Sequence, residues 1–141
     1  MTDFRQPEIL VDTSVAVALC VADHEGRAAA LSIVDGMRIG PAGHAAFEAF
    51  SVLTRLPGLA RRTPSAVGRL LAANFPCSRF LDEKAAAEGL GRLAGTGIAG
   101  GAFYDALVAS AAAKHQVPLA TRDTCALRTY RAFDVEVVII R

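Results

Sequence analysis

Short hydrophobic runs typical of β-strands recur along the chain and are separated by longer segments of helical character. The expected strands are residues 9–11, 37–39, roughly 77–81, 117–120 and 135–140. Strands that alternate with helices in this way are typical of proteins with a mainly parallel sheet. We therefore predict an α/β sandwich, in a single domain that spans residues 1–141.

Turn and capping residues predict where several helices begin and end. The expected helices include residues 41–56, 64–74 and 83–93. Thr63 and Asp82 stand immediately before the last two, where a side-chain oxygen can accept a hydrogen bond from the first free backbone N–H groups. A glycine-rich loop, residues 95–101, should end the third helix.

Four acidic residues stand inside or beside hydrophobic stretches, namely Asp12, Glu48, Asp105 and Asp123. Asp12 and Asp123 each follow an expected strand and precede a helix, so both belong at the carboxyl edge of the sheet, where α/β proteins bind ligands. Glu48 lies in mid-helix and Asp105 in the first turn of another helix. Their apolar neighbours predict that both side chains point inward.

Converging carboxylates without counter-cations raise one another's pKa, so a cluster of this kind normally implies a bound cation or a shared proton. Oxygen ligands alone favour Mg²⁺ or Mn²⁺. Such an ion can polarise a phosphodiester and lower the pKa of an attacking water. If the fold brings the four acids together, the sequence therefore predicts a hydrolytic metal centre.

Each acid also has an ordinary structural interpretation. Asp12 and Asp123 can simply cap the helices that follow them. Asp105 can complement a helix dipole, and Glu48 can be a solvated glutamate on an otherwise apolar helix. Only the occurrence of all four together favours a shared site.

Composition limits the classes of partner. The 141 residues are 52% hydrophobic, and a formal net charge of +1 gives no general attraction to nucleic acid or to an anionic membrane. No apolar run approaches the roughly 20 residues that cross a bilayer. The acidic segment before residues 15–22 is unlike the leading region of an export signal. We expect a soluble, cytoplasmic protein with no membrane partner.

The three cysteines, Cys20, Cys77 and Cys125, are odd in number and far apart. This spacing indicates neither a disulfide framework nor a thiolate zinc site. All three are expected to be small buried hydrophobic residues.

Several segments together resemble one known family. They are Ile-Leu-Val-Asp-Thr-Ser at residues 9–14, Glu48 within a helix, Tyr-Asp-Ala-Leu-Val-Ala at 104–109, and Leu-Ala-Thr-Arg-Asp at 119–123, followed by Tyr130 and a final apolar strand. In order and spacing, over nearly the whole chain, these segments resemble the PIN-domain ribonucleases. The size of the chain is similar to that of the toxins of VapBC-type toxin–antitoxin pairs.

The resemblance implies a three-layer α/β/α sandwich with a central parallel sheet. It also implies endonucleolytic cleavage of RNA that depends on Mg²⁺ or Mn²⁺. A cognate VapB-type antitoxin would neutralise the enzyme, and the family usually forms homodimers. The main alternative is a PIN-like module that binds RNA or protein without cutting.

The same resemblance assigns roles to individual residues. The catalytic and metal-binding acids would be Asp12, Glu48, Asp105 and Asp123. Thr13, Ser14 and Thr121 stand where the family places supporting hydroxyls, which would orient carboxylates or a water on the metal, although ordinary capping explains them equally well. Among the arginines, Arg122 is the one we favour for a phosphate contact, because it adjoins Asp123.

Three other features of the sequence bear on a different kind of site, and none of them indicates one. Residues 95–100 match G-x-G-x-x-G, but a dinucleotide site needs a strand immediately before that motif, and a helix is expected there. His44 stands four residues before Glu48 on the same helix face and can lie near the acids, but one such pair is not a metal site. The chain has no tryptophan and two tyrosines, so the sequence indicates no cluster for base stacking.

Overall fold

A parallel sheet forms the centre of the protein. The structure is a computed structural model that describes residues 6–141, so the first five residues of the predicted domain lie outside it. Within this range one sheet of four strands has the order β2-β1-β3-β4, and every neighbouring pair is parallel. The strands are β1 (Glu8–Val11), β2 (Arg38–Pro41), β3 (Leu119–Thr121) and β4 (Val137–Ile139).

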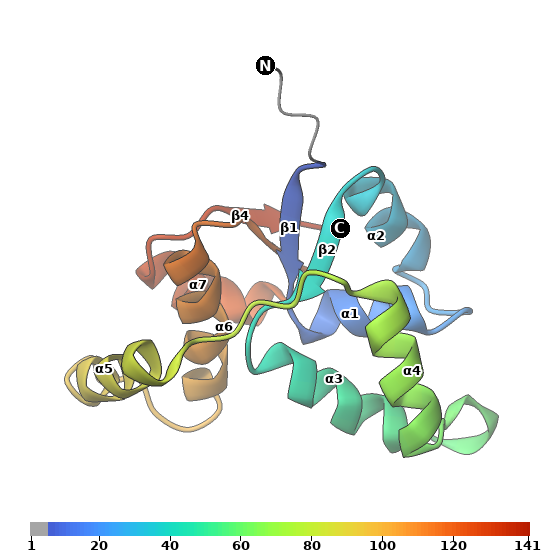
Figure 1. Ribbon diagram of the computed structural model, residues 1–141, viewed down its shortest axis with the longest axis horizontal. Helices are drawn as coiled ribbons and strands as arrows, with labels where there is room; N and C mark the ends of the chain where they lie inside the picture. The colour runs from blue at the N-terminus through green and yellow to red at the C-terminus, as the bar shows by residue number, and fades with distance from the viewer. Residues whose placement is uncertain (1–5) are drawn as a thin grey trace.

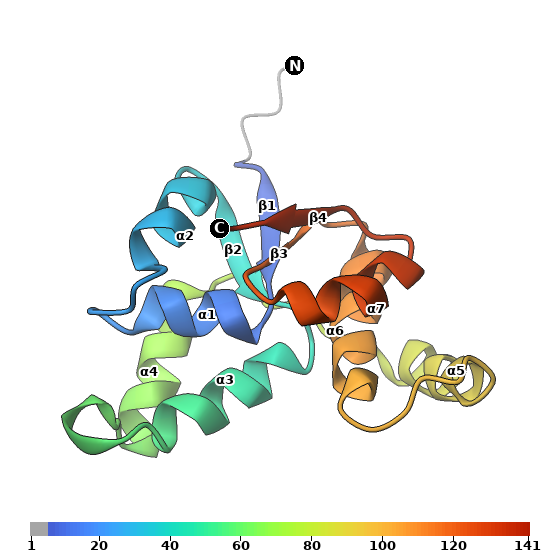
Figure 2. The same cartoon turned by 180° about the vertical axis from the view of Figure 1, so that it is seen from behind.

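Helices cover both faces of this sheet (Figures 1 and 2). They are α1 (Thr13–Cys20), α2 (Arg27–Val34), α3 (Ala45–Thr54), α4 (Pro64–Asn74), α5 (Glu83–Ala94), α6 (Ala102–His115) and α7 (Leu127–Ala132), with 3-10 turns η1 (Gly58–Ala60) and η2 (Thr124–Ala126). Helices α1 to α4 pack against one face, and α6 and α7 against the other. The predicted three-layer α/β/α sandwich is therefore confirmed.

The two-residue period of β1 explains why both faces are covered. Ile9 and Val11 point to one face and join a core with α1, α2, α3 and α4. Leu10 points to the opposite face and packs with Leu119, α6 and α7. Burying each such side chain stabilises the fold by about 1.5–3 kcal/mol.

The capping predictions are confirmed at two helices. Thr63 accepts a hydrogen bond from the backbone N–H of Ala66 at the start of α4. Asp82 accepts one from Ala85 at the start of α5. The glycine-rich residues 95–101 follow α5, so no strand precedes the G-x-G-x-x-G pattern and its context does not fit a dinucleotide site.

The strand predicted at residues 77–81 is wrong. The segment runs beside β2 in extended form, and Cys77 donates a hydrogen bond to the Ile39 carbonyl, but one isolated bridge, Ala42 to Arg79, replaces a continuous ladder. The backbone of this segment passes so close to β2 that position 40 has no room for a side chain, which explains why Gly40 is a glycine. A Cβ on Gly40 would lie 2.1 Å from the carbonyl carbon of Cys77.

The start of α3 also differs from the prediction, because Pro41 is the last residue of β2 and pairs with Val11. Gly43 then turns the chain with a φ of +51°, a conformation that favours glycine. Helix α3 consequently begins at Ala45, and Glu48 lies in its first turn rather than in mid-helix.

The last strand is shorter than predicted. Val135 donates its N–H to the Phe133 carbonyl within a turn, so β4 begins at Val137.

The cysteine prediction holds for two of the three residues. Cys20 and Cys77 are buried, and burial raises the pKa of the Cys20 thiol to about 11. Cys125 is exposed, because it lies in the short η2 turn at the surface.

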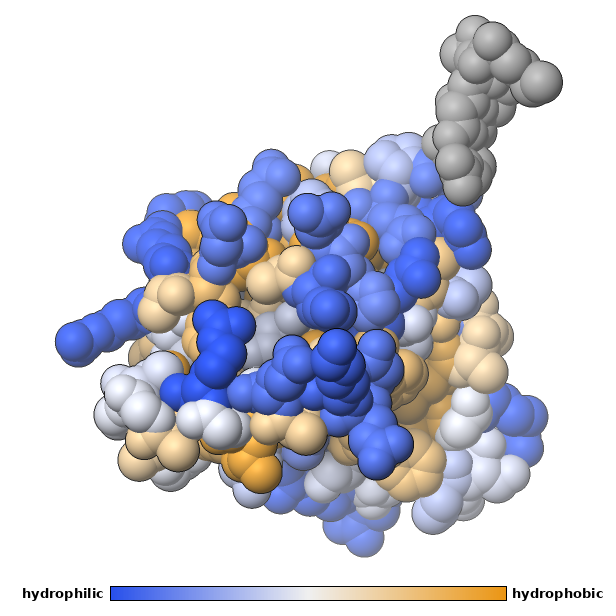
Figure 3. Space-filling view, turned by 60° about the vertical axis from the view of Figure 1, so that its left-hand side comes forward, coloured by the Kyte–Doolittle hydropathy of each residue, from blue (hydrophilic) through white to orange (hydrophobic). Residues whose placement is uncertain are grey.

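On the face that carries α5 and α7, the surface is neither uniformly hydrophilic nor uniformly hydrophobic. Hydrophilic and hydrophobic side chains are interspersed there (Figure 3). Among residues 6–141, the helices lack the combination of length and apolar character that a membrane crossing would require.

Candidate active site

The four predicted acids gather at the carboxyl edge of the sheet. Asp12 directly follows β1, and Asp123 lies two residues after β3. Glu48 and Asp105 lie in the first turns of α3 and α6. Helix α6 begins at this edge because its far end leads into the amino end of β3, and α3 begins here because it follows β2 closely (Figure 1). The topology therefore brings together four residues that are far apart in the sequence.

Asp12 is the most enclosed of the four acids, and four donors surround its carboxylate. Ser14 Oγ and the backbone N–H of Val15 donate to Oδ1 at 2.6 and 3.2 Å. Thr121 Oγ1 and Tyr130 Oη donate to Oδ2, the latter at 2.9 Å. Burial raises the pKa of Asp12, and the hydrogen bonds from Ser14, Thr121 and Tyr130 act in the opposite direction.

The electrostatic coupling of the acids is visible at Asp105. The pKa of this half-buried carboxyl is raised to about 6, first by burial and then by the negative charges of Asp123, Glu48 and Asp12, in that order of importance. Among the described residues, no lysine or arginine forms an ion pair with any of the four acids. The cluster therefore carries uncompensated negative charge.

Glu48 is held from two sides. Thr13 Oγ1 donates a hydrogen bond to its Oε2 at 3.1 Å, and His44 Nε2 lies 3.3 Å from its Oε1. The Glu48 side chain is 37% exposed, so one side of the carboxylate remains open to solvent. It therefore lies at the boundary of the protein rather than pointing fully inward.

Asp123 and Thr121 complete the site from β3. Asp123 is exposed and caps η2 by accepting from the backbone N–H of Cys125 at 2.9 Å. Its own N–H donates to Thr121 Oγ1 at 3.0 Å, and that hydroxyl in turn donates to Asp12. The three predicted hydroxyls, Thr13, Ser14 and Thr121, thus each donate to one of the four acids.

Arg122 lies between Ser14 and the loop before α2. Its backbone N–H donates to Ser14 Oγ at 2.9 Å. Its guanidinium packs against Gly26, where a Cβ would fall 2.3 Å from the arginine Cζ, and its Nε is buried without a hydrogen-bond partner. In this arrangement Arg122 supports the site through its backbone, and its side chain covers the loop before α2.

The donor set fits a divalent cation in its chemistry. The four acids and the hydroxyls beside them offer carboxylate and hydroxyl oxygens, the kind of ligand that Mg²⁺ and Mn²⁺ prefer. Within residues 6–141, however, no three His, Cys, Asp or Glu side chains lie close enough to enclose an ion as they stand. The acids can influence one another's pKa without enclosing an ion, because charges act over longer distances than metal–ligand bonds. A bound Mg²⁺ would also retain several of its waters, so it would need few direct protein ligands.

Two residues that contact the acids, Tyr130 and His44, have only a weak signal in the sequence. Tyr130 is buried in α7, and its hydroxyl reaches Asp12 from the opposite end of the chain. His44 contacts Glu48, as its helical spacing allowed, and its ring also stacks on Tyr104. The other histidines are satisfied elsewhere, since His24 accepts from the Gly26 N–H and His115 bonds the Phe80 carbonyl.

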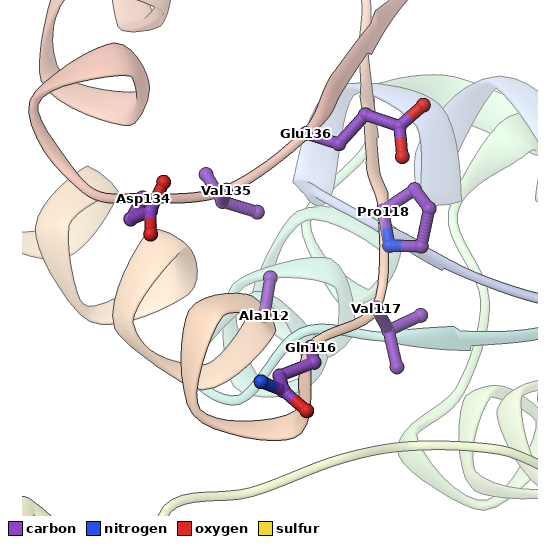
Figure 4. Close-up of a pocket in the computed structure, with 7 residues that line it drawn as sticks. All are labelled: Ala112, Gln116, Val117, Pro118, Asp134, Val135 and Glu136. Atoms are coloured by element: carbon purple, nitrogen blue, oxygen red, sulfur yellow. The ribbon is translucent and has the colours of Figure 1, made fainter.

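The two cavities that stand out lie at the opposite edge of the sheet. One of about 260 Å³ opens beside the amino ends of β3 and β4, and Figure 4 shows the side chains that line it. A second of about 470 Å³ adjoins it at the amino ends of β1 and β2. Neither cavity is lined by any of the four acids.

Comparison with known proteins identifies the family. The PIN domain matches residues 9–132. Ribonuclease VapC27 of Mycobacterium tuberculosis is 44% identical over 135 residues, which cover 95% of this chain and 98% of that relative. These matches rest on sequence and extend over nearly the whole chain.

Two solved structures share the fold. FitAcB from Neisseria gonorrhoeae aligns with a TM-score of 0.60 at 22% identity, over 92% of this chain and 95% of that one. VapC20 of Mycobacterium tuberculosis, a toxin that cleaves the sarcin-ricin loop, aligns with a TM-score of 0.57 at 19% identity, over 77% and 84% of the two chains. Together with the sequence matches, the shared fold shows that the chain belongs to the PIN-domain family, among the ribonucleases of the VapC type.

Proposed function

We propose that this protein is an endoribonuclease that uses Mg²⁺ or Mn²⁺ and acts as the toxin of a toxin–antitoxin pair. Its metal-binding and catalytic acids would be Asp12, Glu48, Asp105 and Asp123. The observation that carries this proposal is the gathering of these carboxylates without a paired lysine or arginine among the described residues. Burial and then the charges of the other three acids raise the pKa of Asp105. The likeness to VapC27, a ribonuclease, supports RNA as the substrate.

A bound divalent cation would polarise the phosphodiester, lower the pKa of the attacking water and stabilise the leaving oxygen. The chain's own contribution is to fix the carboxylates before the substrate arrives. Four donors hold Asp12, and Thr13 holds Glu48. Charges and dipoles that are already oriented need not reorganise during the reaction, which is the main source of electrostatic catalysis.

The proposal includes two assemblies. A VapB-type antitoxin would be the neutralising partner, and a homodimer would be the functional form. Both are supported by the likeness of this chain to the VapC ribonucleases.

The sharpest test replaces Asp123 by asparagine. Asparagine caps a helix as well as aspartate does, so Asp123→Asn should preserve the bond to Cys125 and the fold while it removes one negative charge from the site. We expect wild-type protein to cleave single-stranded RNA with Mg²⁺ or Mn²⁺ and not in EDTA. We expect Asp123→Asn to lose at least about tenfold in kcat/KM, the lower end for perturbed metal sites.

Asp82→Asn is the matched control, because Asp82 caps α5 in the same way and lies outside the site. Full activity of Asp123→Asn would remove this residue from the acidic set. No cleavage by wild type with either metal would favour a non-catalytic PIN-like module. Asp12→Asn is a poorer test, since the new amide N–H₂ would face the hydroxyl donors that now point at Oδ1 or Oδ2.

A further inference from the structure

Four aromatic side chains from three separate segments lie together on the surface. We call them the aromatic surface, and they are His44, Phe47, Phe80 and Tyr104. The His44 and Tyr104 rings stack at 4.8 Å and 15°, and Phe47 meets Phe80 edge to face at 6.0 Å. His44 links the two pairs, with its ring centroid 6.3 Å from that of Phe47.

These rings are unusually open to solvent for their size. Phe47, Phe80 and Tyr104 are 64%, 47% and 48% exposed. Leu59 and Leu90 are also exposed, but single exposed hydrophobic residues are ordinary on protein surfaces. A contiguous group of exposed rings is not ordinary and marks a binding surface.

The aromatic surface borders the acids directly. Phe47 immediately precedes Glu48, and Tyr104 immediately precedes Asp105. His44 contacts both sides, because its ring stacks on Tyr104 while Nε2 lies 3.3 Å from Glu48 Oε1. A phosphodiester placed at Glu48 and Asp105 would therefore have its neighbouring nucleotides beside these rings.

We propose that the aromatic surface is a stacking platform for unpaired bases of the RNA on either side of the cleaved bond. The inference rests on the proposed function, because it takes the four acids as the place of cleavage. Aromatic faces bind bases of any sequence by stacking, which is how proteins commonly hold single-stranded RNA.

Electrostatics gives a reason for such a platform here. The acids repel phosphate until a cation is present, and the net charge of +1 provides little general attraction. Stacking supplies affinity that needs neither metal nor positive charge. A partner protein seated on the same rings would also cover Glu48 and Asp105, and the experiment below separates that case from RNA binding.

The experiment measures RNA binding without cleavage. A short single-stranded RNA carrying 2-aminopurine is titrated with protein in EDTA, and stacking is detected as quenching of the fluorescent base. The variants Phe47→Leu and Tyr104→Leu keep an apolar side chain of similar size and remove the ring. Phe50→Leu is the matched control, since Phe50 lies one turn further along α3, is partly exposed and takes part in none of the ring contacts.

We expect wild type to quench the probe, and each ring variant to raise Kd about fivefold or more, the lower end of what one stacked base contributes. Phe50→Leu should bind as wild type does. Equal RNA binding by wild type and both ring variants would overturn the platform, as would no measurable binding by wild type. Ring variants that change the oligomeric state or antitoxin binding, with RNA binding intact, would assign the rings to a protein interface and overturn it too.

A separate cleavage assay with Mg²⁺ distinguishes this inference from the proposed function. Ring-dependent binding by a wild type that never cleaves RNA would refute the nuclease and support the rings only as a stacking platform for RNA bases. Normal cleavage by both ring variants, with unchanged KM, would leave the nuclease standing and refute the platform.

Discussion

At the scale of the residue, Asp12 combines two roles that the sequence presents as alternatives. Its Oδ1 caps α1 through the Val15 N–H, as a purely structural aspartate would. Its Oδ2 receives hydroxyls from Thr121 in β3 and Tyr130 in α7. A carboxylate has about four lone-pair directions, and all are used here. Direct binding of a cation would therefore require Ser14 or Thr121 to turn its hydroxyl hydrogen away.

Tyr130→Phe tests how much this enclosure stabilises the fold. Tyr130 is 2% exposed and donates to Asp12 at 2.9 Å. Burial and the neighbouring Asp12 charge raise the pKa of its phenol, so the hydroxyl keeps its proton. Loss of a hydrogen bond to a charged group should lower the free energy of unfolding by about 1.5–3 kcal/mol, measured by urea denaturation.

Tyr104→Phe is the control for that measurement, because it deletes the same atom from an exposed ring. It should leave the free energy of unfolding unchanged. Similar losses in the two variants would show that the bond from Tyr130 to Asp12 contributes nothing particular to stability.

At the scale of the element, the extended segment beside β2 is held to the sheet by a side-chain ion pair and by backbone hydrogen bonds that form no continuous ladder. It lies where an edge strand would lie, and Arg79 ties it to β1 through a two-point contact with Glu8 at 2.6 and 3.2 Å. This pairing lowers the pKa of Glu8, chiefly through the hydrogen bond from Arg79. Phe80 belongs to this segment, so the path of the segment along β2 also places one ring of the aromatic surface.

Gly40→Ala tests that close approach. The added methyl would fall 2.1 Å from the backbone of Cys77, which cannot move aside as a flexible side chain can. We expect the free energy of unfolding to fall by about 1–3 kcal/mol or more.

Gly89→Ala is the control in the same urea experiment, and it should change the free energy of unfolding in the opposite direction. Gly89 lies within α5, and a Cβ there would meet nothing within 4 Å. Alanine in a helix interior should raise the free energy of unfolding by roughly 0.5–1 kcal/mol. A harmless Gly40→Ala would mean that the segment beside β2 is free to shift.

At the scale of the whole molecule, the sequence could predict the features that follow from the order of strands and helices along the chain. Alternating strands and helices indicate a parallel sheet, and such a sheet places residues that follow its strands at one edge, which brings Asp12 and Asp123 together. The aromatic surface could not be predicted in this way. Its rings come from α3, α6 and the segment beside β2, and no periodicity links position 80 to positions 44 and 104.

The charge of the whole molecule leads to a prediction about salt. The chain has 15 basic and 14 acidic side chains, Arg79 is paired with Glu8, and the Arg122 guanidinium packs against Gly26. Both of these arginines are therefore engaged within the protein, and the near-neutral net charge favours few contacts to RNA phosphates. For single strands the logarithm of the binding constant falls with the logarithm of salt concentration by about 0.7 per phosphate contact.

We expect metal-free RNA binding to show a slope no steeper than about −2, which corresponds to about three phosphate contacts. Titrations in EDTA at increasing KCl concentrations measure this slope. Phe47→Leu should weaken binding at every salt concentration without changing the slope, because a ring without charge releases no counterions. A slope twice as steep in wild type would instead reveal a basic track that neutralises phosphates, and stacking would then be a minor part of the affinity.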